Sequence, residues 1–101
     1  MVERKRLAIT DDLTIYHALA LKQQLLSALE DADIVELDLA QVAEIDSAGL
    51  QLLILAKRES DRQGKQLSIV AHSPEVRQTI DFCNLAAFFG DPVIITAQEE
   101  A

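Results

Sequence analysis

The residues best placed to do chemistry lie in the segment Asp46-Ser47-Ala48-Gly49-Leu50. The apolar pattern predicts a strand before this segment and a helix that begins at about Ser47. A helix N-terminus offers unpaired N–H groups and a partial positive charge. A serine hydroxyl there is well placed to carry a phosphate, because those N–H groups would receive its oxygens. Ser47 is therefore a candidate phosphorylation site.

Gly49 and a competing role for Ser47 bear on this interpretation. A glycine in the first turn of a helix costs about 1 kcal/mol of helix propensity relative to alanine. The close approach of another backbone or of a partner protein is the usual reason for such a glycine.

As an alternative to a phosphorylation site, Ser47 is only the N-cap of the helix. Because caps are far commoner than switch sites, local chemistry alone favours the capping role.

The remaining polar residues do not indicate an enzyme. Ser47 and Asp46, with either histidine, supply the residue types of a Ser-His-acid triad. Nothing in the spacing of His17 and His72 places them there, and no Gly-x-Ser-x-Gly elbow is present. Asp38 and Asp46 resemble an acid–base pair, but solvated acids beside a docking surface are the simpler interpretation. With no Gly-rich phosphate loop and no metal-ligand cluster, we expect no catalytic residue, metal or cofactor.

A phosphoaspartate receiver is a further alternative, because Asp11 and Asp12 follow a first strand and Asp38 lies near the end of a later one. Asp38 comes only 26 to 27 residues after the acidic pair, too few for the elements that receivers have there. No lysine lies near the predicted last strand. We reject this alternative and expect the acidic pair to cap the first helix.

Composition and charge limit the classes of function that this chain can have. The chain has 101 residues, enough for one domain, and half of them are apolar, which predicts a folded core. Seventeen Asp and Glu against nine Lys and Arg give a formal charge of −8, which disfavours direct nucleic-acid binding. The single cysteine, Cys83, suits a reducing compartment. Apolar runs such as Leu52 to Ala56 are too short for membrane insertion, so we expect a cytoplasmic protein.

Strands and helices alternate along the predicted chain. The expected elements are strands at 4–10, 34–40, 66–71 and 93–95, helices opening at 11–14, 47 and 73, and a helical turn at 85–89. This order predicts one α/β domain over residues 1–101, with about four strands in a mostly parallel sheet, three to four flanking helices and a polar tail at 97–101. Charge on the first strand favours an edge position. Among the side chains, Leu19 and Cys83 are expected in the core.

Two short motifs carry a family resemblance: Leu37-Asp38-Leu39 at a strand end and Asp46-Ser47-Ala48-Gly49-Leu50 at a helix start. Together they resemble the signature of the STAS domain family, the fold of bacterial anti-sigma factor antagonists. Residues 13–16 and 21–22 resemble the entry into the first helix of the family. Residues 72–77, 84–85 and 88–89 resemble its closing helix, although Asn84 stands where glycine is usual. The resemblance covers about residues 7–95. Family members usually have two strands before the first helix, and this chain has room for about one.

The resemblance implies a non-enzymatic regulatory domain that acts through protein partners. An anti-sigma factor or related serine kinase would dock around Ser47 and phosphorylate it, a phosphatase would reverse this, and any effect on transcription would be indirect. The residues implied in partner binding are Asp38, Asp46, Ser47, Ala48, Gly49 and Gln51. STAS domains also serve as constitutive adaptor subunits of transport or chemosensory complexes, in which the serine position carries no phosphate. Both roles fit the sequence, which favours no particular oligomeric state.

Overall fold

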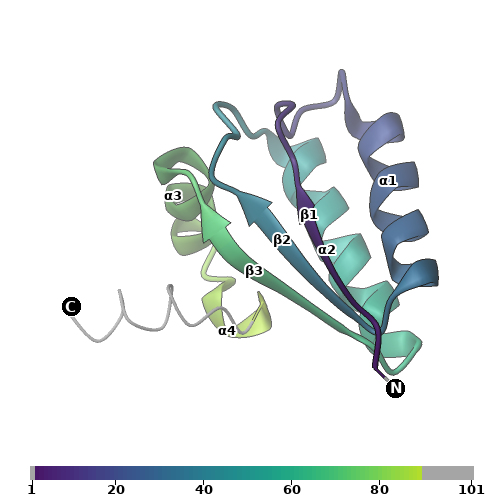
Figure 1. The fold of residues 1–101 in the computed structure, drawn as a ribbon. Coiled ribbons are helices and arrows are strands. Elements are labelled where there is room, and N and C mark those ends of the chain that lie inside the picture. Colours follow the sequence, from purple (N-terminus) through teal and green to yellow (C-terminus); the bar gives the residue numbers. More distant parts are fainter. Residues whose placement is uncertain (1, 90–101) are drawn as a thin grey trace.

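The computed structural model describes residues 2–89 of the chain. Their elements are β1 (Arg4–Ala8), α1 (Ala18–Asp31), β2 (Ile34–Leu39), α2 (Ser47–Arg62), β3 (Gln66–His72), α3 (Pro74–Phe82) and α4 (Ala86–Phe89) (Figure 1). This alternation confirms the predicted α/β class. The predicted last strand at 93–95 and the polar tail at 97–101 lie outside the described residues.

The three described strands form one parallel sheet in the order β1-β2-β3. Among the described strands, β1 therefore lies at an edge of the sheet, as its charge predicts, and β2 is central. In β2, the buried residues Val35, Leu37 and Leu39 alternate with half-buried ones, which is the pattern of a strand with one face in the core. Each pair of strands is joined by a helix, as parallel pairing requires. The sheet thus has three described strands where about four were expected.

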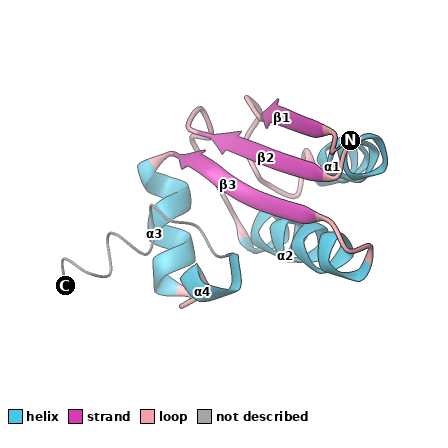
Figure 2. Ribbon diagram, turned by 60° about the horizontal axis from the view of Figure 1, so that its bottom comes forward, coloured by secondary structure: helices cyan, strands magenta, loops and turns pink. Residues whose placement is uncertain are grey.

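Helices α1 and α2 cover one face of the sheet, and α3 and α4 lie next to β3 (Figure 2). The largest fully buried side chains are Ile9, Leu13, Leu21, Leu25, Leu29, Val35, Leu37, Leu39, Leu53, Ile69 and Ile80. The other face of β1 and β2 carries two ion pairs, Arg4 with Glu36 at 3.1 Å and Arg6 with Asp38 at 3.3 Å. Since α1 and α2 also pack against each other, their outer sides form one continuous surface.

The chain between β1 and α1 forms a loop instead of the predicted helix opening, and α1 begins only at Ala18. The N–H of Leu13 donates to the carbonyl of Glu44 at 2.9 Å, and the N–H of Asp46 donates to the carbonyl of Leu13 at 3.0 Å. The carboxylate of Asp12 accepts the N–H of Glu44 at 3.2 Å. Asp12 therefore binds the segment before α2, and its predicted role as a cap of the first helix is wrong.

Two residues expected in the core, Leu19 and Cys83, lie on the surface. Leu19 comes two residues before Leu21 of the buried α1 stripe, and so lies about 200° away around the helix axis. Cys83 is the C-cap of α3, and the next residue, Asn84, adopts a left-handed conformation with φ of 60°. The chain therefore leaves the helix before Cys83 can join its buried face.

Candidate functional site

Ser47 begins α2, as predicted, but it does not cap the helix. The N-cap is Asp46, whose carboxylate Oδ1 accepts the N–H of Gly49 at 2.9 Å. Ser47 is exposed, and its hydroxyl makes no hydrogen bond within residues 2–89. The capping role that local chemistry favours for Ser47 is therefore wrong, because the aspartate one residue earlier fills it. The Ser47 hydroxyl is thus accessible to a partner.

Asp46 also fixes the position of the helix start. Its second carboxylate oxygen, Oδ2, accepts the N–H of Ile15 at 3.0 Å, and its own N–H donates to the carbonyl of Leu13. The N–H groups of Gly49 and Ile15 hold the pKa of the Asp46 carboxyl below its usual value, because they stabilise the charged form. A negative charge therefore lies next to Ser47 at neutral pH.

The close approach predicted for Gly49 is made by the chain's own backbone. Gly49 is buried, and a Cβ at this position would lie 1.9 Å from the carbonyl oxygen of Leu13. The same carbonyl accepts the N–H of Asp46, so the loop before α1 and the first turn of α2 are in direct contact. Gly49 therefore contributes to the site by letting this turn pack on the loop, while Ser47 stays exposed.

Asp38 lies near the end of β2 and has its own partners. Its Oδ1 accepts the N–H of Ala40 at 3.0 Å, and its Oδ2 forms the ion pair with Arg6 of β1. The Ala40 N–H, and to a lesser degree Arg6, lower the pKa of the Asp38 carboxyl. The structure thus brings Asp38 together with β1 across the sheet, and its part in partner binding stays a prediction.

A groove of about 710 Å³ lies between α1 and α2. Ala48 and Gln51, both expected in partner binding, line it. Its other lining residues are Ala18, Leu19, Lys22, Leu52, Ile54, Leu55 and Arg58. Spacings of four, four and three residues place Ser47 on one stripe of α2 with Gln51, Leu55 and Arg58. Ser47 therefore lies at the head of the surface that lines this groove, which we call the α1–α2 groove.

The sequence alone does not single out the exposed apolar side chains near this helix start. Leu19 and Leu55, on the α1–α2 groove, are 71% and 42% exposed, and Ile15 and Tyr16, in the preceding loop, are 63% and 90% exposed. The available signal is that the middle of α2 has more apolar residues than one helix face can bury. Clustered apolar exposure of this kind is typical of a docking surface.

Within residues 2–89, the structure forms no catalytic triad at Ser47. The hydroxyl of Ser47 has no hydrogen-bond partner within residues 2–89, so neither histidine is placed as its general base. His17 precedes α1, and its Nδ1 lies 3.5 Å from the hydroxyl of Thr14. The residue types of a triad are therefore present without its geometry.

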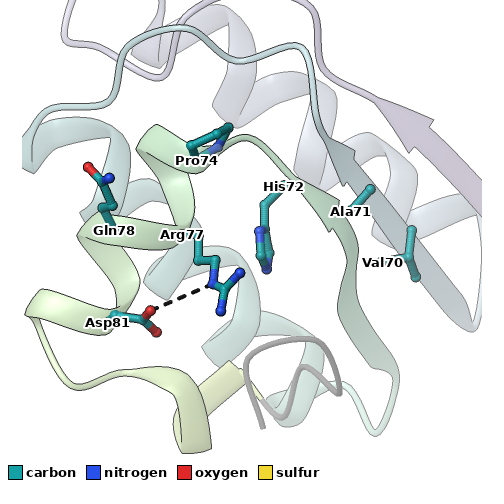
Figure 3. Close-up of a pocket in the computed structure, with 7 residues that line it drawn as sticks. All are labelled: Val70, Ala71, His72, Pro74, Arg77, Gln78 and Asp81. Atoms are coloured by element: carbon teal, nitrogen blue, oxygen red, sulfur yellow. Dashed lines mark ion pairs between the residues drawn. The ribbon is translucent and has the colours of Figure 1, made fainter. Parts of the chain in front are cut away.

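The second histidine, His72, lines a different pocket, between the end of β3 and α3 (Figure 3). This pocket has a volume of about 650 Å³, and Arg77 and Asp81 also line it. These two form an ion pair at 3.8 Å within α3, so the cation is already neutralised. His72 thus belongs to a pocket that shares no lining residue with the α1–α2 groove.

Within residues 2–89, no three His, Cys, Asp or Glu side chains are grouped as metal ligands would be. None of the described helices is long and apolar enough to cross a bilayer. α2, the longest of them, has 16 residues, against about 20 for a typical span.

Comparison with known proteins gives matches to a family and to a fold. A protein-family model described as Mlab, STAS domain, matches residues 2–94. No curated protein sequence matches the chain. Among solved structures, the anti-sigma factor antagonist SpoIIAA in its unphosphorylated form is similar over 99% of this chain and 90% of that chain, with a TM-score of 0.70 and 16% identity. The Bacillus cell fate determinant SpoIIAA in the phosphorylated form is similar over 96% of this chain and 86% of that chain, with a TM-score of 0.59 and 16% identity.

Proposed function

This chain belongs to the STAS domain family, and we propose that it is a regulatory protein-interaction domain similar to the anti-sigma factor antagonists. It performs no catalysis of its own. A partner serine kinase of the anti-sigma factor type docks at the start of α2 and phosphorylates Ser47, and a phosphatase removes the phosphate. The observation that carries this proposal is the exposed hydroxyl of Ser47, free of hydrogen bonds within residues 2–89, at a helix start that Asp46 already caps.

The geometry supports a switch that leaves the fold in place. Phosphorylation of Ser47 breaks no hydrogen bond within residues 2–89, since its hydroxyl makes none there. The N–H of Gly49 is already bound by Asp46, so the phosphate would remain at the surface instead of becoming the cap. It would add about −1.5 to −2 charges next to an ionised carboxylate. An acidic partner surface would then be repelled, so the phosphate acts on binding and not on folding.

The structural matches support a phosphorylation switch on this fold. SpoIIAA has been solved in an unphosphorylated and a phosphorylated form, and the structures of both are similar to this chain. We extend the proposal to a cytoplasmic protein whose effect on transcription is indirect. The formal charge of −8 supports this extension, because it disfavours direct contact with nucleic acid.

A second candidate function is that of a constitutive adaptor subunit in a transport or chemosensory complex. The observation that favours it is the apolar exposure along the α1–α2 groove, which needs no modification to hold a partner. In this role Ser47 is part of the docking surface and carries no phosphate.

The two candidates differ in what a negative charge at position 47 does to partner binding. Tagged wild-type protein, Ser47→Ala and Ser47→Asp would be purified from the native cells, and co-purified proteins would be quantified by mass spectrometry. We expect the amount of co-purified partner to be unchanged for Ser47→Ala and to fall about tenfold or more for Ser47→Asp. Ser27→Asp, at an exposed serine of α1, is the matched control and should change nothing. Equal recovery with Ser47→Asp would contradict the switch and favour the adaptor.

A further inference from the structure

Two basic side chains that line the α1–α2 groove make no ion pair or hydrogen bond within residues 2–89. All nine Lys and Arg lie within residues 2–89. Those with an ion pair or hydrogen bond inside the chain are Arg4, Lys5, Arg6, Lys57, Arg62, Lys65 and Arg77. Lys22 and Arg58 have none within residues 2–89, and both are exposed and line the groove. Two unpaired positive charges therefore share one groove of a protein whose formal charge is −8.

The same groove is apolar and long. Leu19 of α1 and Ile54 and Leu55 of α2 contribute apolar side chains to it. Lys22 and Leu55 also line a smaller hollow, whose other lining residues are Leu26, Glu30, Glu59 and Gln63. The two hollows share Lys22 and Leu55, so they adjoin along the helix pair, in which α2 with its 16 residues is about 24 Å long.

We propose that the α1–α2 groove binds an acidic amphipathic helix of a partner protein. A helix laid along it would place an apolar stripe on Leu19, Ile54 and Leu55, in the manner of other helix-in-groove complexes. Its carboxylates would lie next to Lys22 and Arg58, since no acidic residue within residues 2–89 lines the larger hollow.

The distribution of charge along the groove also orients the occupant. Glu30 and Glu59 line the smaller hollow only, and Glu59 is already paired with Arg62. The acidic residues of the bound helix therefore belong over the larger hollow, where Arg58 lies, with Lys22 at the point where the two hollows meet. The smaller hollow accepts neutral or basic residues.

Two other occupants fit this groove less well. In a two-fold symmetric dimer the same patch of each copy meets the other, so Lys22 and Arg58 would face their own counterparts. A membrane surface is planar, and a concave groove between two helices matches a rod better than a plane.

This inference rests on the proposed function for its regulation, and adds to it the class of segment that docks. Because Ser47 shares the α2 stripe with Gln51, Leu55 and Arg58, a phosphate on Ser47 would lie at the head of the groove. It would repel the acidic residues of the bound helix. Phosphorylation would therefore release the partner from the groove.

A pair of designed peptides tests the groove directly. One is a helical peptide of about 16 residues with leucines at i, i+3, i+4 spacing and glutamates elsewhere, and the other has lysine in place of every glutamate. Fluorescence anisotropy measures affinity, and amide shifts of ¹⁵N-labelled protein locate the site. We expect the Glu peptide to bind about tenfold more tightly or better than the Lys peptide, with shifts along α1 and α2.

Charge reversal provides the matched comparison. In the variant Lys22→Glu/Arg58→Glu, the preference should invert, so that the Lys peptide binds more tightly. The control Arg4→Glu/Arg77→Glu changes the net charge equally outside the groove and should keep the wild-type preference. Circular dichroism confirms that each variant is folded.

Several results would overturn the proposal: equal affinity for the two peptides, no binding of either at millimolar concentration, shifts outside the groove, or inversion in the control variant. A dimer seen by light scattering, or binding to phosphatidylglycerol vesicles, would do the same if Lys22→Glu/Arg58→Glu abolished it. Ser47→Asp separates this proposal from the switch. If the Glu peptide binds in the groove and Ser47→Asp leaves its affinity unchanged, the groove assignment stands and the phosphorylation switch fails.

Discussion

Replacing Gly49 by alanine tests how the start of α2 is built. The added Cβ would lie 1.9 Å from the carbonyl oxygen of Leu13, a backbone atom that cannot move aside as a side chain can. Overpacking costs about 1–3 kcal/mol, and more where the backbone must shift. Alanine regains about 1 kcal/mol of helix propensity. We therefore expect Gly49→Ala to lower the free energy of unfolding by about 2 kcal/mol.

Urea unfolding followed by far-UV circular dichroism measures this loss as a lower midpoint with an unchanged slope. Gly64→Ala is the control, because the space around Gly64 is open and only its φ of +71° disfavours alanine. That variant should lose about 1 kcal/mol, from backbone strain alone. A Gly49→Ala protein as stable as the wild type would refute the contact between the Leu13 loop and α2.

The other predictions concern caps, pH and the cysteine. Ser73→Ala should cost about 1 kcal/mol in the same assay, because Ser73 caps α3 through the N–H of Val76, whereas Ser47→Ala should change stability by less than about 0.5 kcal/mol. Equal effects of the two variants would contradict the assignment of the α2 cap to Asp46. The pKa of Asp46 is lowered by folding, so its stabilising contribution is complete above the ordinary value of 3.8 and is lost as the pH falls through the lower folded value. Urea midpoints from neutral to acidic pH should show this decline, and Asp46→Asn should reduce it; an identical decline in that variant would refute the role of the carboxylate. Exposed Cys83 should react with a thiol reagent in the native protein nearly as fast as in urea, and a rate limited by unfolding would contradict its surface position.

Periodicity in the sequence suffices for the elements that bury a regular face. The alternation of β2 and the start of α2 at Ser47 are both predicted from it and found in the structure. The loop before α1 is not predictable in this way. Asp12 is as suitable for capping a helix as for binding a loop, and the N–H groups that it accepts lie 31 and 32 residues further along the chain. Such a choice is made by tertiary contacts.

In the candidate site, too, some features follow from the local sequence and others are decided by tertiary contacts. Asp46 and Ser47 are adjacent residues that both favour the N-cap position, so local chemistry does not decide between them. The contact of Asp46 with the N–H of Ile15, a residue from another loop, favours the aspartate. Likewise, the sequence indicates a close approach at Gly49 but not that Leu13 makes it.

The central claim is that a phosphate on Ser47 controls partner binding. The most direct measurement is the phosphate occupancy of Ser47 in protein isolated from the native cells, by intact mass and peptide fragmentation, in the free and partner-bound pools. We predict phosphate on Ser47 in the free pool and an unmodified serine in the partner-bound pool. Phosphate in neither pool, or equal occupancy in both, would contradict the claim.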